Sequence, residues 1–251
     1  MTGSVEITSD TVLFVGGDTP GGRAFYALAM DQGRGSDGPG QRISFVSAGD
    51  VPVPPQGCWV PCFGADDHVA AGRRALDLGA RPAGTVPIDG RDQPVYSAPD
   101  GALFGLTDIP GSRPHSQRLG DVAFVDLYTP LAEEAAAYYA ETLSCHLIDE
   151  PAPGPGNYRL LVSADRPVAG VVDMLDVLPS VVPPHWIPFL RVLDLEAEVA
   201  RLSDLGARVR VPATDSAMGP FAVLVDPFGV AFGLQTPVSD DLLRKYATTR
   251  G

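Results

Sequence analysis

The chain has 251 residues, of which 45% are hydrophobic and 20% charged, so it can bury a core and is not a wholly disordered chain. Its 31 acidic residues outnumber 18 lysines and arginines, and the net charge of −13 repels nucleic-acid phosphates and anionic lipid. Composition therefore argues against nucleic-acid partners and membrane partners, and no apolar run reaches the roughly 18 residues of a membrane span.

Cysteine usage and the N-terminal segment favour a cytoplasmic location. Cys58, Cys62 and Cys145 cannot all pair, and none of them forms a Cys-x-x-Cys motif. The N-terminal segment contains Glu6 and Asp10 and lacks the basic start and apolar stretch of a secretory signal. We therefore expect a reduced, intracellular protein.

The first half of the chain contains a glycine-rich segment that imitates a nucleotide-binding motif. Residues 33–38 have the Gly-x-Gly-x-x-Gly spacing. In a dinucleotide site these glycines follow a strand and open a helix, whereas here they follow a predicted helix and precede Pro39-Gly40. We therefore predict a loop, and a first half that has lost or shortened a strand.

The second half gives clearer element signals. Val122 to Tyr128 is β-rich, and Thr129-Pro130 predicts a helix start before the alanine-rich stretch that ends at Leu143. The spacing of Leu195, Val199 and Leu202 predicts a second amphipathic helix. Four further segments are predicted to be strands, namely 158–163, 186–192, 221–225 and 230–235.

The two halves repeat one another. Trp59-Val60-Pro61 returns as Trp186-Ile187-Pro188, and Asp77-Leu78-Gly79-Ala80-Arg81 returns as Asp204-Leu205-Gly206-Ala207-Arg208 at the same offset. Phe25-Tyr26 near the front of the chain corresponds to Tyr138-Tyr139. The repeat predicts a first module in residues 1–107, a linker in 108–120, a second module in 121–236 and a tail or short helix in 237–251.

This arrangement resembles the vicinal oxygen chelate superfamily of glyoxalase I, bleomycin-resistance proteins and extradiol dioxygenases. The features that carry the resemblance are the helix with an aromatic-Tyr pair, the Trp-containing strand, the helix ending in Leu-Gly-Ala and the Asp-Pro-x-Gly turn before the last strand. It covers roughly residues 11–107 and 121–236. The resemblance implies an α+β fold with two tandem βαβββ modules whose curled mixed sheets surround a cavity.

The resemblance also implies a metal, which the sequence does not support. Enzymes of that superfamily hold a divalent metal through His and Glu on cavity-facing strand positions. The matching positions here carry no imidazole or carboxylate, being Phe124, Ile187 and Gly233 in the second module and Thr11, Val60 and Gly105 in the first. We therefore expect no metal ligands and no cofactor.

Strand alternation brings a different set of side chains to the cavity of the second module. A face with Phe124 also carries Asp126 and Tyr128, and a face with Phe189 also carries Arg191. Asp126 is a candidate base, Arg191 a candidate for stabilising negative charge and Tyr128 a candidate donor. Alternatively, Asp126 and Arg191 form a structural ion pair.

Other side chains are candidates for binding the ligand. Gln235 on the last strand and His185 before the Trp-containing strand would line the cavity or its mouth. Trp59 and Trp186 are either stacking platforms for an aromatic ligand or core residues.

Two functions fit this sequence. The first is a metal-independent enzyme, a lyase, isomerase or cyclase, acting on a small, largely apolar oxygenated metabolite. The second is a non-catalytic protein that binds and sequesters a small molecule, as bleomycin-resistance proteins do. A third possibility is an interaction module whose cavity has collapsed. A monomer and a homodimer are both compatible with the sequence.

Overall fold

The computed structural model describes residues 8–15, 20–30, 42–65, 67–88, 91–108, 119–151, 157–163, 166–175, 181–216 and 218–236. Most of the predicted linker and the whole predicted tail from residue 237 lie outside the described residues. The same holds for the glycine-rich segment 33–38.

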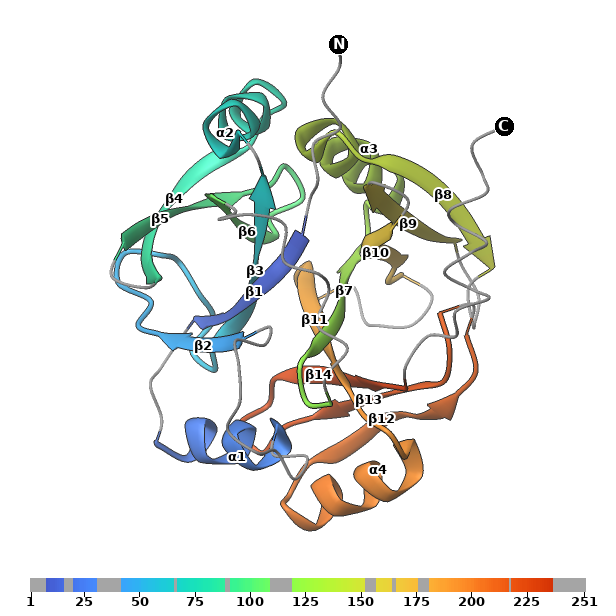
Figure 1. The fold of residues 1–251 in the computed structure, drawn as a ribbon. Coiled ribbons are helices and arrows are strands. Elements are labelled where there is room, and N and C mark those ends of the chain that lie inside the picture. The colour runs from blue at the N-terminus through green and yellow to red at the C-terminus, as the bar shows by residue number, and fades with distance from the viewer. Residues whose placement is uncertain are drawn as a thin grey trace.

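Two curled mixed sheets form the frame of the molecule (Figure 1). The first has the order β2-β1-β3-β6-β5-β4 and is built from Thr8–Val15, Arg42–Val46, Cys58–Ala65, Arg81–Ile88, Arg91–Ser97 and Leu103–Asp108 in chain order. The second has the order β12-β13-β14-β11-β7-β10-β9-β8. Its strands β7 to β14 are Val122–Thr129, His146–Pro151, Asn157–Ser163, Arg166–Asp173, His185–Arg191, Arg208–Thr214, Phe221–Val225 and Ala231–Gln235. The predicted α+β fold with curled mixed sheets is confirmed.

Both sheets are assembled from a smaller repeated unit. The order β-α-β-β-β occurs three times, from β3 to β6, from β7 to β10 and from β11 to β14, with one helix in each unit. The described part of the first unit has only β1, a helix and β2. The sequence predicted one such unit per half, whereas the structure shows two in the second half and, in the described part of the first half, one complete unit preceded by β1, α1 and β2.

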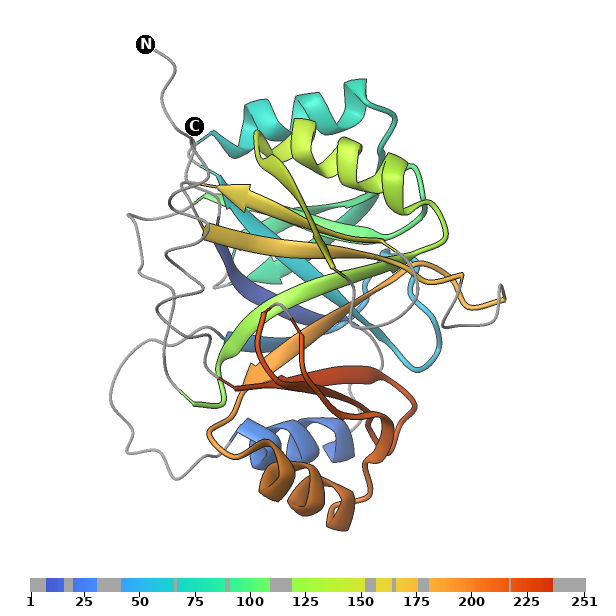
Figure 2. The same cartoon turned by 90° about the vertical axis from the view of Figure 1, so that its right-hand side faces the viewer.

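Four helices pair at the two ends of the sheets (Figure 2). At one end α1, Pro20–Met30, lies beside α4, Leu195–Asp204, and at the other α2, His68–Asp77, lies beside α3, Ala132–Leu143. Each pair joins a helix of the first half to one of the second. None of the described helices is long and apolar enough to cross a membrane.

Local signals located most of the predicted elements but misplaced one helix start. α3 begins at Ala132, and Thr129 remains in β7, where its hydroxyl accepts a hydrogen bond from the backbone N–H of Leu131. The predicted cap at Thr129 is therefore wrong. The prediction also omitted β8, β10 and β12 from the second sheet.

The repeated residues occupy equivalent places. Trp59 and Trp186 are each the second residue of their strands, β3 and β11. Gly79 and Gly206 follow α2 and α4 with φ of 101° and 97°, a backbone conformation that favours glycine. The shared motif therefore specifies the same strand, helix and turn twice.

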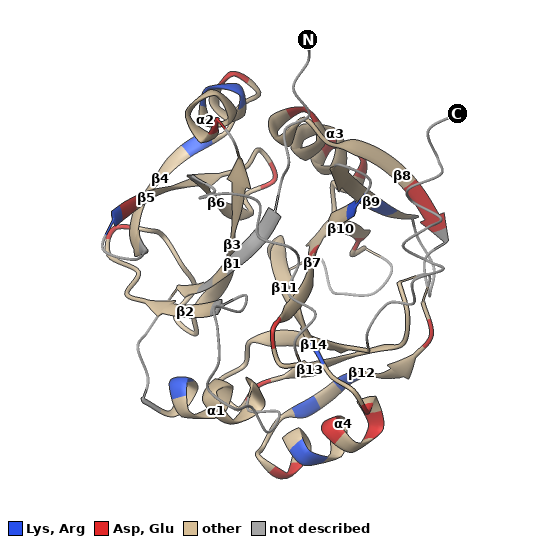
Figure 3. Ribbon diagram, viewed as in Figure 1, with Lys and Arg blue, Asp and Glu red and all other residues tan. Residues whose placement is uncertain are grey.

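The main core lies between the two sheets and beneath the helices. It contains the large aromatic side chains of both halves, with Tyr26 packed against Trp59 and Phe232, and Tyr139 against Trp186. Charged residues concentrate on the helices and outer strands (Figure 3). Because the core is continuous between the halves, the fold of each half supports the other.

A separate apolar cluster fills the inner face of the first sheet. Its buried members are Val15, Val46, Val51, Val60, Cys62, Val86 and Val95. Burial raises the pKa of the Cys62 thiol to about 12, so this side chain stays neutral. Among the described residues, this inner face has the character of a packed core.

The hydrogen bond between Tyr26 and Asp226 predicts a measurable contribution to stability. The phenol of α1 in the first half donates to Oδ2 of Asp226 in the second at 2.9 Å, and both groups are buried. Tyr26→Phe should lower the free energy of unfolding by about 1–3 kcal/mol, because a buried carboxylate oxygen loses its donor. Urea denaturation measures this loss. Tyr96→Phe is the control, because the Tyr96 hydroxyl has no hydrogen-bond partner among the described residues; equal losses in the two variants would contradict the prediction.

Candidate active site

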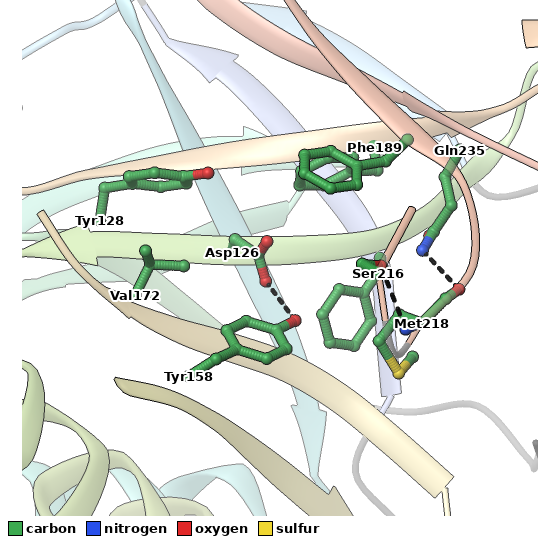
Figure 4. Close-up of a pocket in the computed structure, with 10 residues that line it drawn as sticks. Asp126, Tyr128, Tyr158, Val172, Phe189, Ser216, Met218 and Gln235 are labelled. Carbon is green, nitrogen blue, oxygen red and sulfur yellow. Dashed lines mark hydrogen bonds between the residues drawn. The ribbon is translucent and has the colours of Figure 1, made fainter. Parts of the chain in front are cut away.

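Asp126 lies in the middle of the second sheet. Its strand β7 is flanked by β11, where Ile187 is opposite Asp126, and by β10, where Gly170 is opposite. Asp126 is 7% exposed, and its Oδ1 accepts a hydrogen bond from the hydroxyl of Tyr158 at 3.0 Å (Figure 4). No donor among the described residues reaches the other carboxyl oxygen.

A glycine makes the contact between Asp126 and Tyr158 possible. Tyr158 is on β9, which is separated from β7 by β10, so its side chain must cross over the intervening strand. At the crossing point stands Gly170, where an added Cβ would lie 2.1 Å from Oδ1 of Asp126 and 2.4 Å from the Tyr158 hydroxyl oxygen. Only a residue without a side chain leaves room for this hydrogen bond.

Burial changes the acidity of Asp126. Desolvation raises its pKa from 3.8 to about 7, and the hydrogen bond from Tyr158 lowers it by a smaller amount. Because a base works best when its pKa lies near the working pH, this carboxyl group is suited to accept a proton and return it.

Asp126 opens into a cavity that is mostly aromatic and aliphatic (Figure 4). The cavity has a volume of about 70 Å³ and is lined by Phe124, Asp126, Tyr128, Tyr158, Val172, Phe189, Ser216, Met218, Phe221 and Gln235. This volume holds about two water molecules. A ring-sized ligand therefore requires a side chain of the lining to move, and the flexible thioether of Met218 is the natural one.

The turn that carries Met218 is fixed over the cavity by polar contacts. Gln235 on β14 donates its amide N–H to the backbone oxygen of Met218 at 2.9 Å. The hydroxyl of Ser216 accepts from the backbone N–H of Met218 at 3.1 Å and donates to the oxygen of Gly219 at 2.7 Å. Gln235 thus lies in the cavity wall as predicted, with its amide N–H bonded to the turn.

Tyr128 and His185 form a stacked pair near Asp126. Their ring centroids are 5.7 Å apart and the planes differ by 16°. Desolvation and, to a smaller extent, the charge of Asp126 raise the pKa of Tyr128, so its phenol remains a proton donor. Desolvation lowers the pKa of His185, whose Nδ1 lies 2.9 Å from the oxygen of Pro183.

The structure separates Arg191 from Asp126. Arg191 is the last residue of β11, is buried, and lies beside the charge of Asp121. It is not among the described residues that line the cavity. The predicted pairing of Asp126 with Arg191, whether catalytic or structural, is therefore wrong, because the pairing of β11 with β7 shifts after Phe189 and the strand end meets Asp121.

Both tryptophans face away from the cavity. Trp186 alternates with the cavity-facing Ile187 and packs in the core between the sheets, where its ring lies 5.3 Å from that of Tyr139. Trp59 is also in this core and donates its indole N–H to the oxygen of Ala231 at 2.8 Å. The structure favours the core-packing interpretation, and neither tryptophan is among the described residues that line the cavity.

The positions that hold a metal in the superfamily do not fit one here. A side chain at residue 233 would collide with the ring of Phe189, which comes within 2.2 Å of the Cβ position of Gly233. At the corresponding place in the first sheet, Cys62 comes within 2.6 Å of the Cβ position of Gly105. Among the described residues, no three His, Cys, Asp or Glu side chains are grouped to hold a metal ion.

Gly170→Ala tests the geometry of this site. The methyl group must displace Asp126 or Tyr158, so we expect the hydrogen bond to break and the free energy of unfolding to fall by about 1–3 kcal/mol. Gly170→Ala and Tyr158→Phe together should cost less than the sum of their separate losses, since the hydrogen bond can be lost only once, while the collision with Asp126 and the ring of residue 158 remains. Chemical denaturation of the four proteins measures this coupling. Simple additivity would contradict the assigned contact.

Comparisons with known proteins give two groups of relatives. No protein-family model matches the chain. It is 31% identical over 119 residues to CFP32 of Mycobacterium tuberculosis, a protein assigned by name to the glyoxylases, and the match covers 47% of this chain and 46% of CFP32. It is 29% identical over 191 residues to the anthracycline biosynthesis protein DnrV of Streptomyces peucetius, covering 70% of this chain and 64% of DnrV. The chain thus spans about half the length of CFP32 in this match.

Solved structures share the fold across nearly the whole chain. The Mn(II)-bound glyoxalase from Novosphingobium aromaticivorans matches with a TM-score of 0.65 and 15% identity, over 93% of this chain and 82% of the glyoxalase. The 2,2',3-trihydroxybiphenyl 1,2-dioxygenase from Sphingomonas wittichii matches with a TM-score of 0.62 and 12% identity, over 93% and 91%. The chain therefore shares the fold of these glyoxalase and dioxygenase structures, and together with the sequence relatives this fold supports the resemblance to the vicinal oxygen chelate superfamily.

Proposed function

We propose that the protein is an enzyme of the lyase, isomerase or cyclase type that works without a metal and transfers a proton with Asp126. Its substrate is a small, largely apolar oxygenated molecule held on the inner face of the second sheet. The observation that carries the proposal is the buried carboxyl group of Asp126, with a pKa of about 7, opening into an aromatic cavity.

The neighbouring side chains suit this reaction. The hydrogen bond from Tyr158 fixes the orientation of Asp126 and leaves its second oxygen for the substrate. The phenol of Tyr128, in the same cavity, would donate to the oxygen on which negative charge develops when the substrate loses its proton. Because the described lining contains no Lys, Arg or His, an uncharged substrate fits better than an anion.

Two further observations support a reaction without a metal and a small-molecule substrate. The rings of Phe124 and Phe189 and the side chain of Ile187 occupy the face on which the superfamily carries its metal ligands. DnrV, whose match covers 70% of this chain, takes its name from anthracycline biosynthesis. We therefore place the substrate among oxygenated aromatic metabolites.

A chromogenic carbon acid tests the proposal. In 5-nitrobenzisoxazole a base removes the ring C–H proton, the N–O bond breaks, and a coloured cyanophenolate forms. We expect saturable ring opening whose kcat/KM rises with pH through about 7, because Asp126 must be ionised to act. Asp126→Asn should reduce this rate about a hundredfold or more while leaving probe affinity within about tenfold.

Asp149→Asn is the matched control, because it makes the same change on an exposed carboxylate of β8. Its rate should equal that of the unchanged protein. Saturable binding of the probe with no ring opening above the buffer rate would contradict the proposed enzyme. That result would favour the alternative function, a protein that only binds and sequesters small molecules.

A further inference from the structure

Two polar side chains stand at opposite ends of the Asp126 cavity. Tyr128 on β7 is paired with His185, the first residue of β11. Gln235 on β14 is paired with Arg191, the last residue of β11. Tyr128 and Gln235 both line the cavity, and Figure 4 shows them on either side of Asp126. A ligand that fills the cavity therefore meets a polar group at each end.

The amide group of Gln235 is oriented by the turn that it holds. Its Nε2 donates to the backbone oxygen of Met218 at 2.9 Å, and only the nitrogen of an amide group donates hydrogen bonds. This contact fixes which amide atom is which, and Oε1 has no donor among the described residues. Gln235 is 4% exposed and lines the cavity, so Oε1 is a buried acceptor that a ligand in the cavity can satisfy.

An aromatic wall lies between the two ends. The ring of Phe189 covers Gly233, which is two residues before Gln235 on the same strand. It packs edge to face on the ring of Phe221, with 6.0 Å between the centroids. Phe124 adds a third ring to this cluster. An aromatic ligand body packs well against this wall, and its ends reach the polar groups.

The two ends differ in chemistry. At one end are the carboxyl group of Asp126, which accepts a proton in the proposed reaction, and the phenol of Tyr128, which donates. At the other end, Oε1 of Gln235 is an uncharged acceptor and requires a donor. A hydroxyl group supplies that donor, whereas an ether or carbonyl oxygen does not. A site that accepts from a substrate hydroxyl discriminates against an analogue without it, because the acceptor is then left unpaired.

We propose that Gln235 determines the specificity of the site for an aromatic substrate with a hydroxyl group at the end remote from Asp126. The hydroxyl donates to Oε1 of Gln235, and the ring lies against Phe189. This role rests on the substrate site proposed above, but it concerns binding and does not require that Asp126 transfers a proton.

The compounds 2,6-dihydroxynaphthalene and 2-naphthol form a matched pair of probes, because they differ only in a hydroxyl group at the far end of the ring system. Fluorescence titration at neutral pH should show saturable binding of both, with the diol bound about tenfold more tightly. Gln235→Leu should reduce this affinity ratio to about twofold or less, since the second hydroxyl loses its acceptor. Gln235→Asn withdraws the amide by one methylene; it should also lower the ratio, and it replaces Gln235→Leu if that variant does not fold.

Two control variants separate this role from a structural one. Ser216→Ala removes a hydrogen bond to Met218 in the same turn but keeps Gln235. It should therefore weaken both probes alike and leave the affinity ratio near tenfold. Gln93→Leu makes the same change as Gln235→Leu on β5, outside the described cavity lining, and should leave both affinities unchanged.

Three results would overturn the role of Gln235. They are the absence of saturable binding, equal affinity for the two probes, and a tenfold ratio that survives Gln235→Leu. Because neither probe undergoes ring opening, failure of this role is distinguishable from failure of the proposed reaction. A missing ratio with ring opening that still depends on Asp126 would contradict only the role of Gln235, and a tenfold ratio without any ring opening would contradict only the enzyme.

Discussion

A carboxyl group buried in the centre of a sheet is the constraint on which the candidate site depends. Removing Asp126 from water costs free energy in its charged form, and the structure offers it one hydrogen bond, from Tyr158. The pKa therefore rises to about 7, and folding favours the protonated form. The stability provided by the neutral carboxyl group is complete below about pH 4 and is lost as the pH rises through about 7.

The same constraint accounts for the neighbouring residues. Gly170 must lack a side chain so that Tyr158 can reach across β10, and a carboxylate left without that donor would be costlier still. On the other side of β7, the ring of Phe189 fills the space above Gly233. The face on which the superfamily carries metal ligands thus has an aromatic wall here, and Asp126 is the one carboxyl group among its described lining residues.

Local sequence pattern was sufficient for part of this site. Because strand side chains alternate with a period of two, Phe124, Asp126 and Tyr128 could be assigned to one face, and the structure places all three in the cavity lining. The repeat located both Trp-containing strands and the glycine turns after α2 and α4, since identical local motifs adopt identical turns. The fold class was implied by the family resemblance that these motifs carry.

Long-range contacts could not be predicted in this way. Tyr158 and Asp126 are on β9 and β7, which β10 separates, so their contact depends on the position of β10 in the sheet. β10 was absent from the predicted elements. Gly170 in the middle of a β-rich run was a usable signal, because a glycine inside a strand often marks a close approach of another group. Strand alternation assigned Arg191 to the same face as Phe189, but at the end of β11 Arg191 lies beside Asp121. Neither outcome is encoded in neighbouring residues.

The titration of the Asp126 carboxyl group tests the proposed buried base most directly. Carbon-13 NMR of the side-chain carboxyl groups, with the Asp126 signal assigned by comparison with Asp126→Asn, gives its titration curve in the folded protein. A midpoint near pH 7 is the predicted result. A midpoint near its ordinary value of 3.8 would show a solvated carboxylate and contradict both the buried site and its role as a base.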